Sequence, residues 1–518
     1  MNVLLLYPQF PDTYWSFKHA LKFVGKKVTS PPLGLLTVAA LMPNEWNKKL
    51  IDMNASRLSQ EDIQWADMIM ISAMIVQRDS VRSIINRVKP YGKKIVAGGP
   101  LFTAEPEKFL EIDHLILNEA EVTFSLFLID MISGSAQHIY TSQEFPDITK
   151  TPIPAWDLLD MKNYDSMSIQ YSRGCPYNCE FCDVTVLFGH RPRTKSAAQL
   201  IAELDQLYDR GWRRNIFFVD DNFIGNKRQL KDEILPALIK WRQGKVGCLF
   251  LTEASINLAD DDELIQMMVQ AGFHSVFIGI ETPDESSLGE CNKVQNQNRD
   301  LLASIKKLQK SGLQVMGGFI VGFDNDDPSI FERQVSFIQD SGILTAMVGL
   351  LNALPGTALH ARLQKEGRIL EESSGDNVDG RTNFITRMAP DTLQKGYRSI
   401  LIRIYSPELF YKRIKTFLTE FRPARPPVTL EVQEMLALFR AIWKLGILGR
   451  ERRQFWDLIF WTLQKDYHKF PLAITFSIYG YHFRRITEEH LKPLSRRSVI
   501  SSPGKIEPQH QPSVVYKP

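Results

Sequence analysis

Three of the five cysteines in this 518-residue chain fall within eight residues, in the sequence RGCPYNCEFCD. Cys175, Cys179 and Cys182 are spaced C-x3-C-x2-C and directly follow a predicted strand. Three thiolates on one short loop can bind three irons of a [4Fe–4S] cluster and leave the fourth iron open to another ligand. A structural zinc site, with His190 as the nearest candidate for a fourth ligand, is the alternative.

The composition of the chain is that of a folded globular protein. Hydrophobic residues make up 44% and charged residues 23%, which excludes a disordered or collagen-like chain. Five cysteines are too few for a disulfide framework in so long a chain. No apolar run reaches the roughly 18 residues that span a bilayer, and the N-terminus has no signal-peptide pattern. We therefore expect a cytoplasmic protein.

The pattern of apolar runs predicts an α/β fold that begins with a doubly wound domain over residues 1–140. Its strands are expected at residues 2–7, 49–53, 68–73, 94–97 and 114–117. Ligands of such a sheet bind at the carboxyl ends of the strands. Short polar and glycine-containing sequences follow the predicted strands at these ends, among them Ser72-Ala73-Met74 and Gly98-Gly99-Pro100.

A proline-containing linker over residues 141–167 leads into a second alternation of strands and helices over residues 168–370. Six strand-helix units predict a partial (β/α)6 barrel of TIM type, with strands at 168–173, 215–220, 247–253, 275–281, 313–322 and 345–351. Residues 371–495 read as a helical C-terminal domain, and residues 496–518 as a disordered tail.

The cysteine loop at the mouth of such a barrel resembles that of the radical S-adenosylmethionine (SAM) superfamily. The resemblance implies a [4Fe–4S] cluster on the three cysteines, SAM on the open iron, and Phe181 against the adenine. Carboxylates at the strand ends, in FFVDDNF, TEAS and GIET, match positions that hold the ammonium group and ribose of SAM; helix caps or solvated loops are their alternative interpretation. The implied SAM-binding residues are Phe181, Asp220, Asp221, Glu253, Glu281, Gly317 and Gly318.

A doubly wound domain in front of this barrel resembles the cobalamin-binding class of the same superfamily. The implied cobalamin-binding residues are Pro31 and Gly34 in the sequence PPLG, Ser72, and the pair Gly98-Gly99. Mutase-type cobalamin domains carry Asp-x-His-x-x-Gly where this chain has PPLG, so we expect no histidine on the cobalt. His19, in the same loop, reads as a packed or surface residue.

The resemblance implies a cobalamin-dependent radical SAM methyltransferase acting on an unactivated carbon, such as one in a lipid of the hopanoid type. An external one-electron reductant of ferredoxin or flavodoxin type is then required. No acid, base or nucleophile with convincing spacing is found, so no catalytic side chain is assigned, and nucleic acid is not an expected partner. The alternatives are an oxidoreductase or cyclase of the tetrapyrrole type and a non-catalytic cobalamin sensor or carrier.

The C-terminal region is basic and aromatic. Residues 421–518 carry 16 Lys or Arg against 8 Asp or Glu. Around FWDLIFWTLQKDYHKF, five residues can share an apolar helix face with basic residues at its ends: Phe455, Trp456, Leu458, Ile459 and Leu463. Packing against the barrel is the first interpretation, and peripheral contact with the inner membrane is the second.

Overall fold

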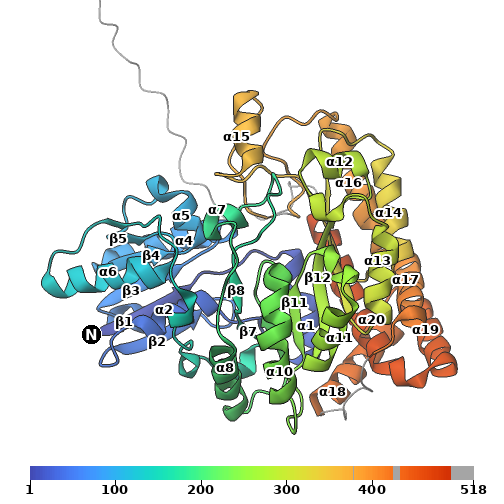
Figure 1. Cartoon of the computed structure of the whole chain (residues 1–518), viewed down its shortest axis with the longest axis horizontal. Helices are drawn as coiled ribbons and strands as arrows, with labels where there is room; N and C mark the ends of the chain where they lie inside the picture. Colours follow the sequence, from blue (N-terminus) through green and yellow to red (C-terminus); the bar gives the residue numbers. More distant parts are fainter. Residues whose placement is uncertain (377, 424–431, 492–518) are drawn as a thin grey trace, which may run out of the picture.

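The computed structural model describes residues 1–376, 378–423 and 432–491, and its arrangement of elements is shown in Figure 1. Two six-stranded parallel sheets follow one another along the chain, and helices pack against both. The predicted α/β fold is confirmed. The predicted disordered tail at 496–518 lies outside the described residues.

The first sheet has the order β2-β1-β3-β4-β5-β6 and is parallel throughout. Helices α3, α4 and α5 bury one face of it, and α2 and α6 the other, so the domain is doubly wound as predicted. The short last strand was not predicted from the sequence. The elements are β1 (Asn2–Tyr7), α2 (Leu33–Leu41), β2 (Asn47–Asp52), α3 (Gln60–Trp65), β3 (Met68–Ser72), α4 (Arg78–Val88), β4 (Lys94–Gly98), α5 (Pro100–Ala104), β5 (His114–Ile116), α6 (Ala120–Ser133) and β6 (Ile139–Tyr140).

The second sheet has the order β14-β13-β12-β11-β10-β7, so the barrel is partial and open between β14 and β7. The first predicted strand divides in two: after β7, residues Ser172–Arg173 form β8, which pairs antiparallel with β9 (Arg193–Thr194). The barrel strands are β7 (Ser166–Ile169), β10 (Asn215–Phe218), β11 (Phe250–Glu253), β12 (Phe273–Glu281), β13 (Gln314–Val321) and β14 (Ala346–Leu350).

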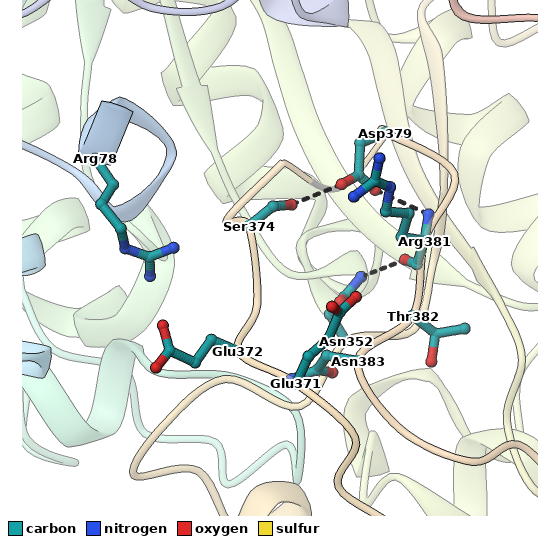
Figure 2. A pocket seen from close by; sticks show the side chains of 9 residues that line it. All are labelled: Arg78, Asn352, Glu371, Glu372, Ser374, Asp379, Arg381, Thr382 and Asn383. Carbon is teal, nitrogen blue, oxygen red and sulfur yellow. Dashed lines mark hydrogen bonds between the residues drawn. The ribbon is translucent and has the colours of Figure 1, made fainter. Parts of the chain in front are cut away.

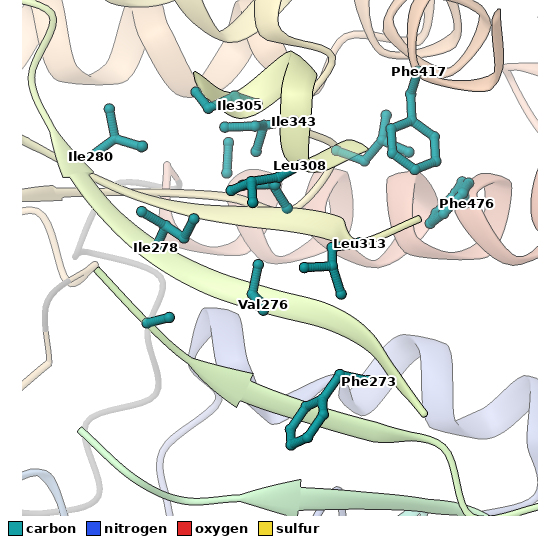
Figure 3. Packing of buried hydrophobic residues seen from close by; sticks show 14 of the residues in the cluster. Phe273, Val276, Ile278, Ile280, Ile305, Leu308, Leu313, Ile343, Phe417 and Phe476 are labelled. Atoms are coloured by element: carbon teal, nitrogen blue, oxygen red, sulfur yellow. The ribbon is translucent and has the colours of Figure 1, made fainter. Parts of the chain in front are cut away.

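Side chains alternate between the two faces of the barrel strands. Figure 3 shows Val276, Ile278 and Ile280 of β12 packed outward near Ile305 and Leu308 of α13 (Leu301–Lys310). On the concave, inward face, alternate residues of the same strands stay partly exposed. The barrel therefore presents an accessible inner wall.

Helix ends follow the predicted signals. The capping box of Ser196 and Gln199 opens α8 (Ala197–Asp209), with both reciprocal hydrogen bonds present. Gly272 and Gly342 end α11 (Asp262–Ala271) and α14 (Ile330–Ser341) in the left-handed conformation that glycine adopts without a Cβ clash.

The C-terminal helices belong to the same hydrophobic core as the barrel rather than to a separate one. Residues 366–389 between α15 and α16 contain no helix or strand longer than a bridge among the described residues. None of the helices among residues 1–376, 378–423 and 432–491 is long and apolar enough to cross a membrane. The helices are α15 (Ala358–Lys365), α16 (Pro390–Ile404), α17 (Pro407–Glu420), α18 (Val432–Ala441), α19 (Arg452–Lys465) and α20 (Phe470–His490).

The connection between β1 and α2 leaves its own sheet. Its helix α1 (Lys18–Val24) packs against α18 and α20, beside the barrel (Figure 1). After α1 the chain runs along β7, where the amides of Asp165 and Ser166 donate to the carbonyls of Val28 and Thr29 at 3.0 and 2.8 Å. We call residues 13–30 the closing segment, because they lie across the open side of the barrel.

Candidate active site

The cysteine loop is held at its base by the β8-β9 ribbon. Gly174, directly before Cys175, has a φ of +93°, and a Cβ there would lie 2.8 Å from the carbonyl oxygen of Gly189. The amide of Cys175 donates to the same carbonyl at 3.3 Å. Glycine is therefore required where the two ends of the loop meet.

The tip of the loop is fixed by groups that follow three barrel strands. The side-chain amide of Asn292, after β12, donates to the backbone carbonyl of Asn178 at 2.8 Å. The side-chain amide of Asn257, after β11, donates to the Tyr177 hydroxyl at 2.8 Å. Glu180 forms an ion pair with Arg362 of α15 at 2.6 Å. These contacts hold the loop over the carboxyl ends of the strands.

All three thiols of the loop are partly exposed. Side-chain amides approach two of them: Asn222 donates to the Cys175 sulfur at 3.9 Å and Gln295 to the Cys179 sulfur at 3.6 Å. Within the described part of the chain, no three Cys, His, Asp or Glu side chains converge on a single metal ion. The donor set of three free thiols with amide neighbours fits an iron–sulfur cluster better than one zinc ion.

Asp220 fixes the chain that enters the loop. Its carboxylate is fully buried and accepts hydrogen bonds from the amides of Tyr171 and Ser172 and from the Ser172 hydroxyl, the last at 2.6 Å. Burial outweighs these hydrogen bonds and raises the pKa of Asp220 to about 6. Its hydrogen bonds are therefore with Tyr171 and Ser172, directly before the loop.

Asp221 and Glu253 follow β10 and end β11, on neighbouring strands. Burial, with Asp220 and Asp183 nearby, raises the pKa of Asp221 to about 7. Burial, with Asp221 and Asp220 nearby, raises the pKa of Glu253 to about 8. Two carboxyl groups that repel one another in a desolvated place form an attractive site for a bound cation.

An irregularity at the end of β12 changes the direction of the Glu281 side chain. The β12-β13 register shifts between Gly279 and Glu281, and Glu281 has a φ of +63°, which is uncommon outside glycine. Its carboxylate pairs with Lys293 at 2.7 Å. Burial alone would lower the pKa of Lys293. The nearby Glu281 and Cys179 raise this pKa by more than burial lowers it, so the pKa of Lys293 lies above its usual value. A charged pair therefore stands beside the cysteine loop.

Phe181 and the two glycines of β13 have mainly apolar neighbours. The Phe181 ring lies 6.4 Å from that of Phe323 and 5.8 Å below the Lys293 ammonium. A Cβ on Gly318 would come 2.9 Å from the Phe277 ring, and one on Gly317 would come 2.8 Å from the Phe319 ring. Both glycines thus make room for aromatic rings on opposite faces of the sheet.

In the first domain, small residues line the carboxyl ends of β3 and β4. Ser72 pairs with Gly98 in the sheet register. Gly99 has a φ of +95°, and a Cβ there would lie 2.9 Å from the Ser72 hydroxyl oxygen. A side chain at Gly99 would collide with Ser72, so glycine is required for the ends of β3 and β4 to lie this close together.

The PPLG sequence opens α2 of the first domain. Pro31 is buried, whereas Gly34 is exposed with open space where a Cβ would point. His19 lies in α1 and pairs with Glu489 of α20 at 3.2 Å, so it is a packed residue of the closing segment as expected.

An ion-pair network joins the first domain to the cysteine loop. Arg173 in β8 contacts Glu119 at 2.6 Å and Glu121 at 2.7 Å, and Arg193 in β9 contacts Glu119 at 2.6 Å. The Glu119 side chain is 5% exposed and that of Arg173 11%. These four residues were not predicted from the sequence; Arg173, which precedes the cysteine motif, was the available signal.

A polar pocket of about 500 Å³ lies between the first domain and the segment after the barrel (Figure 2). Arg78 of α4 contributes from one side, bound to Glu105 at 3.0 Å and to the carbonyl of Ser373 at 3.3 Å. Its other lining residues are Asn352, Glu371, Glu372, Ser374, Asp379, Arg381, Thr382 and Asn383. Such a lining suits a ligand rich in amide or hydroxyl groups.

Comparison with known proteins agrees with this arrangement. Residues 26–128 match the B12 binding domain, residues 169–338 the Radical SAM superfamily, and residues 357–495 a domain of unknown function. The chain belongs to the cobalamin-binding class of the radical SAM superfamily, and its cofactors are a [4Fe–4S] cluster, SAM and cobalamin.

Two curated relatives align with nearly the whole chain. An uncharacterized methyltransferase of Synechocystis sp. is 42% identical over 496 residues, covering 94% of this chain and 92% of the relative. The hopanoid C-2 methylase of Rhodopseudomonas palustris is 33% identical over 469 residues, covering 88% of each. The chain is accordingly a radical SAM methyltransferase.

Solved structures share the fold at low sequence identity. The cobalamin-dependent SAM radical enzyme OxsB, with aqua-cobalamin and SAM bound, has a TM-score of 0.62 at 16% identity and covers 95% of this chain and 79% of its own. The radical SAM methyltransferase TsrM of Kitasatospora setae has a TM-score of 0.57 at 14% identity, covering 89% and 99%.

Proposed function

We propose that this methyltransferase acts on an unactivated carbon of a lipid of the hopanoid class. The relationship to the hopanoid C-2 methylase at 33% identity carries the proposal. An apolar inner wall supports it, because Phe217, Leu251, Met316 and Met347 are partly exposed on the concave face of the barrel. A hydrocarbon substrate can be desolvated against such a wall.

We assign Cys175, Cys179 and Cys182 to the cluster and the carboxyl groups of Asp221 and Glu253 to the cationic part of SAM. When bound, the cluster and SAM supply the radical chemistry that activates a C–H bond, and cobalamin supplies the methyl group. The chain's own residues bind and orient. Asp220 fixes the entrance to the cysteine loop. Ser72, Gly98 and Gly99, at the carboxyl ends of β3 and β4, would offer the cobalamin tail backbone and small side chains.

Phe181 and Glu281 complete the proposed SAM site as its apolar and charged borders. Gly317 and Gly318 would contribute only backbone to it, because the Phe319 and Phe277 rings cover their Cβ positions. Pro31 and Gly34 border the proposed cobalamin site, and the polar pocket beside Arg78 suits the amide groups of the corrin ring. No acid or base is assigned. Reductive cleavage of SAM would need one electron, which we propose comes from an external reductant of ferredoxin or flavodoxin type.

The test is expression in a hopanoid-producing bacterium that lacks the methylase, followed by mass spectrometry of total lipids and pigments. The proposed function predicts a hopanoid heavier by one methyl group, absent with the matched variant Cys182→Ala. A methylated or ring-modified pigment would favour the tetrapyrrole alternative. No change in either fraction, with a loaded cluster in the purified protein, would reject the lipid substrate.

We further propose that the protein takes up its lipid substrate from a membrane. The protein surface that would contact the membrane is formed by α18, the helical turn that follows it (Ile442–Ile447), and α19. On this surface, which we call the apolar patch, exposed side chains include Phe439 (64%), Trp443 (59%), Leu448 (66%) and Phe460 (59%). Lys444, Arg452 and Arg453 are exposed on the same elements, and Arg450 is exposed in the connection between them. Apolar residues bordered by cations suit an anionic lipid surface.

The apolar patch differs from the apolar helix face that the sequence predicts around residues 455–463. Phe455, Leu458 and Ile459 are buried in the shared core, so only part of the expected surface is exposed. A truncation after Glu420 would expose that core and is a poor test.

Paired substitutions of exposed residues keep the core intact. Phe439→Ser with Leu448→Ser is expected to reduce flotation on vesicles rich in phosphatidylglycerol, whereas Leu110→Ser, at an exposed apolar position in the first domain, is not. Equal flotation of all three proteins, or flotation of none, would reject the membrane surface.

A further inference from the structure

The closing segment is anchored to the barrel through Tyr14. Its ring stacks on Phe483 of α20 at 4.3 Å with an interplanar angle of 6°, and its hydroxyl lies 2.8 Å from that of Tyr405. Tyr405 in turn donates to the carbonyl of Ala346, the first residue of β14, at 2.6 Å. Residue 14 is therefore fixed beside one open edge of the barrel, although it follows the first strand of the other sheet.

The next residue, Trp15, reaches the concave face of the barrel. Its ring packs edge-on against Phe277 of β12 at 5.4 Å, and its indole N–H donates to the sulfur of Met347 in β14 at 3.0 Å. Both partners face inward on their strands. Trp15 is nevertheless 38% exposed, whereas Tyr14 is 4% exposed. The indole is thus only partly covered by its two partners on the inner wall.

The strand between these two partners leaves room for the rings. In the sheet register, Gly318 of β13 pairs with Met347 on one side and with Gly279 of β12 on the other. The Phe277 ring lies over Gly318, which has no side chain to exclude it. The partly exposed Met316 continues the same wall, two residues from Gly318.

The wall is layered along the barrel axis. Toward the carboxyl ends of the strands, the pair Glu281–Lys293 lies over Gly279 and makes that layer charged. Below it, the layer made by Trp15, Phe277 and Met347 is apolar except for an indole N–H that already has its acceptor. A substrate in contact with this lower layer would gain from apolar surface and find few polar partners.

We infer that Trp15, supplied by the cobalamin-binding domain, is a specificity-determining residue that binds a rigid, fused-ring hydrocarbon against Phe277 and Met347. This inference rests on the proposed function, whose substrate class it refines. Trp offers a large flat surface and Met an adaptable one, so together they suit a bulky apolar ring system. The substrate site is then complete only when the closing segment lies against β14.

The first experiment measures binding without turnover. The reconstituted holoenzyme is titrated with a dibrominated pentacyclic triterpene, whose bromine atoms quench nearby indoles. We expect the wild type and Trp65→Phe, which removes a 36% exposed indole from the first domain, to lose the same absolute fluorescence. Trp15→Phe is expected to lose clearly less fluorescence, because this variant lacks the indole that the bound probe would quench.

A second variant identifies the other place at which the probe could bind. Trp443→Phe removes an indole from the apolar patch and is expected to be quenched like the wild type. Full quenching in Trp15→Phe, or no quenching in the wild type, would overturn the inference. Quenching that depends on Trp443 but not on Trp15 would overturn it as well.

The second experiment concerns turnover of the identified substrate. Trp15→Ala is expected to raise KM about tenfold, in line with the loss of aromatic contact worth roughly 1.4 kcal/mol, with Trp15→Phe between it and the wild type. An unchanged KM would overturn the inference even if lipid methylation is established, and quenching by the probe would support it even if the natural substrate proves to be another apolar molecule.

Discussion

The five cysteines differ in burial: Cys175, Cys179 and Cys182 are partly exposed, whereas Cys248 and Cys291 are buried. Cys291, far from the motif in sequence, accepts a hydrogen bond at its carbonyl from the amide of Glu180 at 2.9 Å, inside the loop. Its thiol, however, is 2% exposed, lies 3.6 Å from the carbonyl of Leu288, and has a pKa raised by burial. Proximity alone therefore does not make it a ligand.

We predict that anaerobically reconstituted Cys175→Ala, Cys179→Ala and Cys182→Ala each lose most of the bound iron and sulfide, and that the triple variant loses all of it. Cys291→Ala is the matched control near the loop, and Cys248→Ala the control far from it. Iron analysis and visible absorption measure the result. Loss of the cluster in Cys291→Ala, or its retention in the triple variant, would contradict the assignment.

The buried carboxyl groups impose a pH dependence on the protein without cofactors. The pKa of Glu253 in the folded chain is about 8, above the value of 4.5 for an exposed glutamate, because burial disfavours the charge. The folded chain thus keeps a proton that the unfolded chain releases above pH 4.5. Its contribution to stability is greatest at low pH and is lost as the pH rises through about 8.

We predict that the temperature at the midpoint of thermal unfolding of the apoprotein decreases as the pH is raised from 6.5 to 8. The same temperature is expected to decrease less for Glu253→Gln. The difference in slope should not exceed about 1.4 kcal/mol per pH unit, the limit for one proton. Glu111→Gln, at an exposed position, is expected to follow the wild type. Parallel profiles for all three proteins would contradict the raised pKa of Glu253.

The local parts of the site could be predicted from the sequence. The cysteine spacing is continuous in sequence, and Asp220, Asp221 and Glu253 follow strands whose carboxyl ends meet at one edge of a parallel sheet. The partners could not be predicted: Lys293 with Glu281, and Arg173 with Glu119, meet only because the fold brings together residues 12 and 54 positions apart.

At the scale of elements, the strands were predicted well because their apolar runs are uninterrupted. The closing segment was not, because the sequence WSFKHALKF has the pattern of an ordinary amphipathic helix and does not say which sheet it covers. Only the contacts of Tyr14 and Trp15 with the barrel and α20 reveal its role.

We predict that Tyr14→Ala destabilises the barrel by roughly 3–5 kcal/mol, the usual cost of removing a buried aromatic ring, and Tyr14→Phe by about 1 kcal/mol for the hydroxyl. Hydrogen exchange should rise in β7 and β14, which border the open side, and stay low in β1 and β3. Phe109→Ala, a buried ring in the first domain, should give the opposite pattern. If Tyr14→Ala increased amide hydrogen exchange only in β1 and β3, the closing segment would stabilise the sheet of the first domain and not the barrel.

At the scale of the whole molecule, two contacts bind the first domain to the barrel on different sides. The closing segment lies along the open edge, and the network of Glu119, Glu121, Arg173 and Arg193 lies at the cysteine loop. In the proposed function, cobalamin held by the first domain would supply a methyl group to a substrate in the barrel, so the relative position of the two domains would be part of the chemistry.

The buried network makes this position sensitive to one residue. Glu119→Gln keeps the size of the side chain but leaves Arg173 and Arg193 with one buried anion fewer, which typically costs about 3–5 kcal/mol. Glu332→Gln breaks an exposed pair with Arg403 and is expected to cost under about 1 kcal/mol. By calorimetry, we expect the wild type and Glu332→Gln to unfold in one transition and Glu119→Gln to unfold in two, because its domains no longer stabilise each other. A single transition for Glu119→Gln at the wild-type temperature would mean that other contacts, such as the closing segment and the bond of Arg78 to the Ser373 carbonyl, hold the domains together, and that the network serves only to shape the cysteine loop.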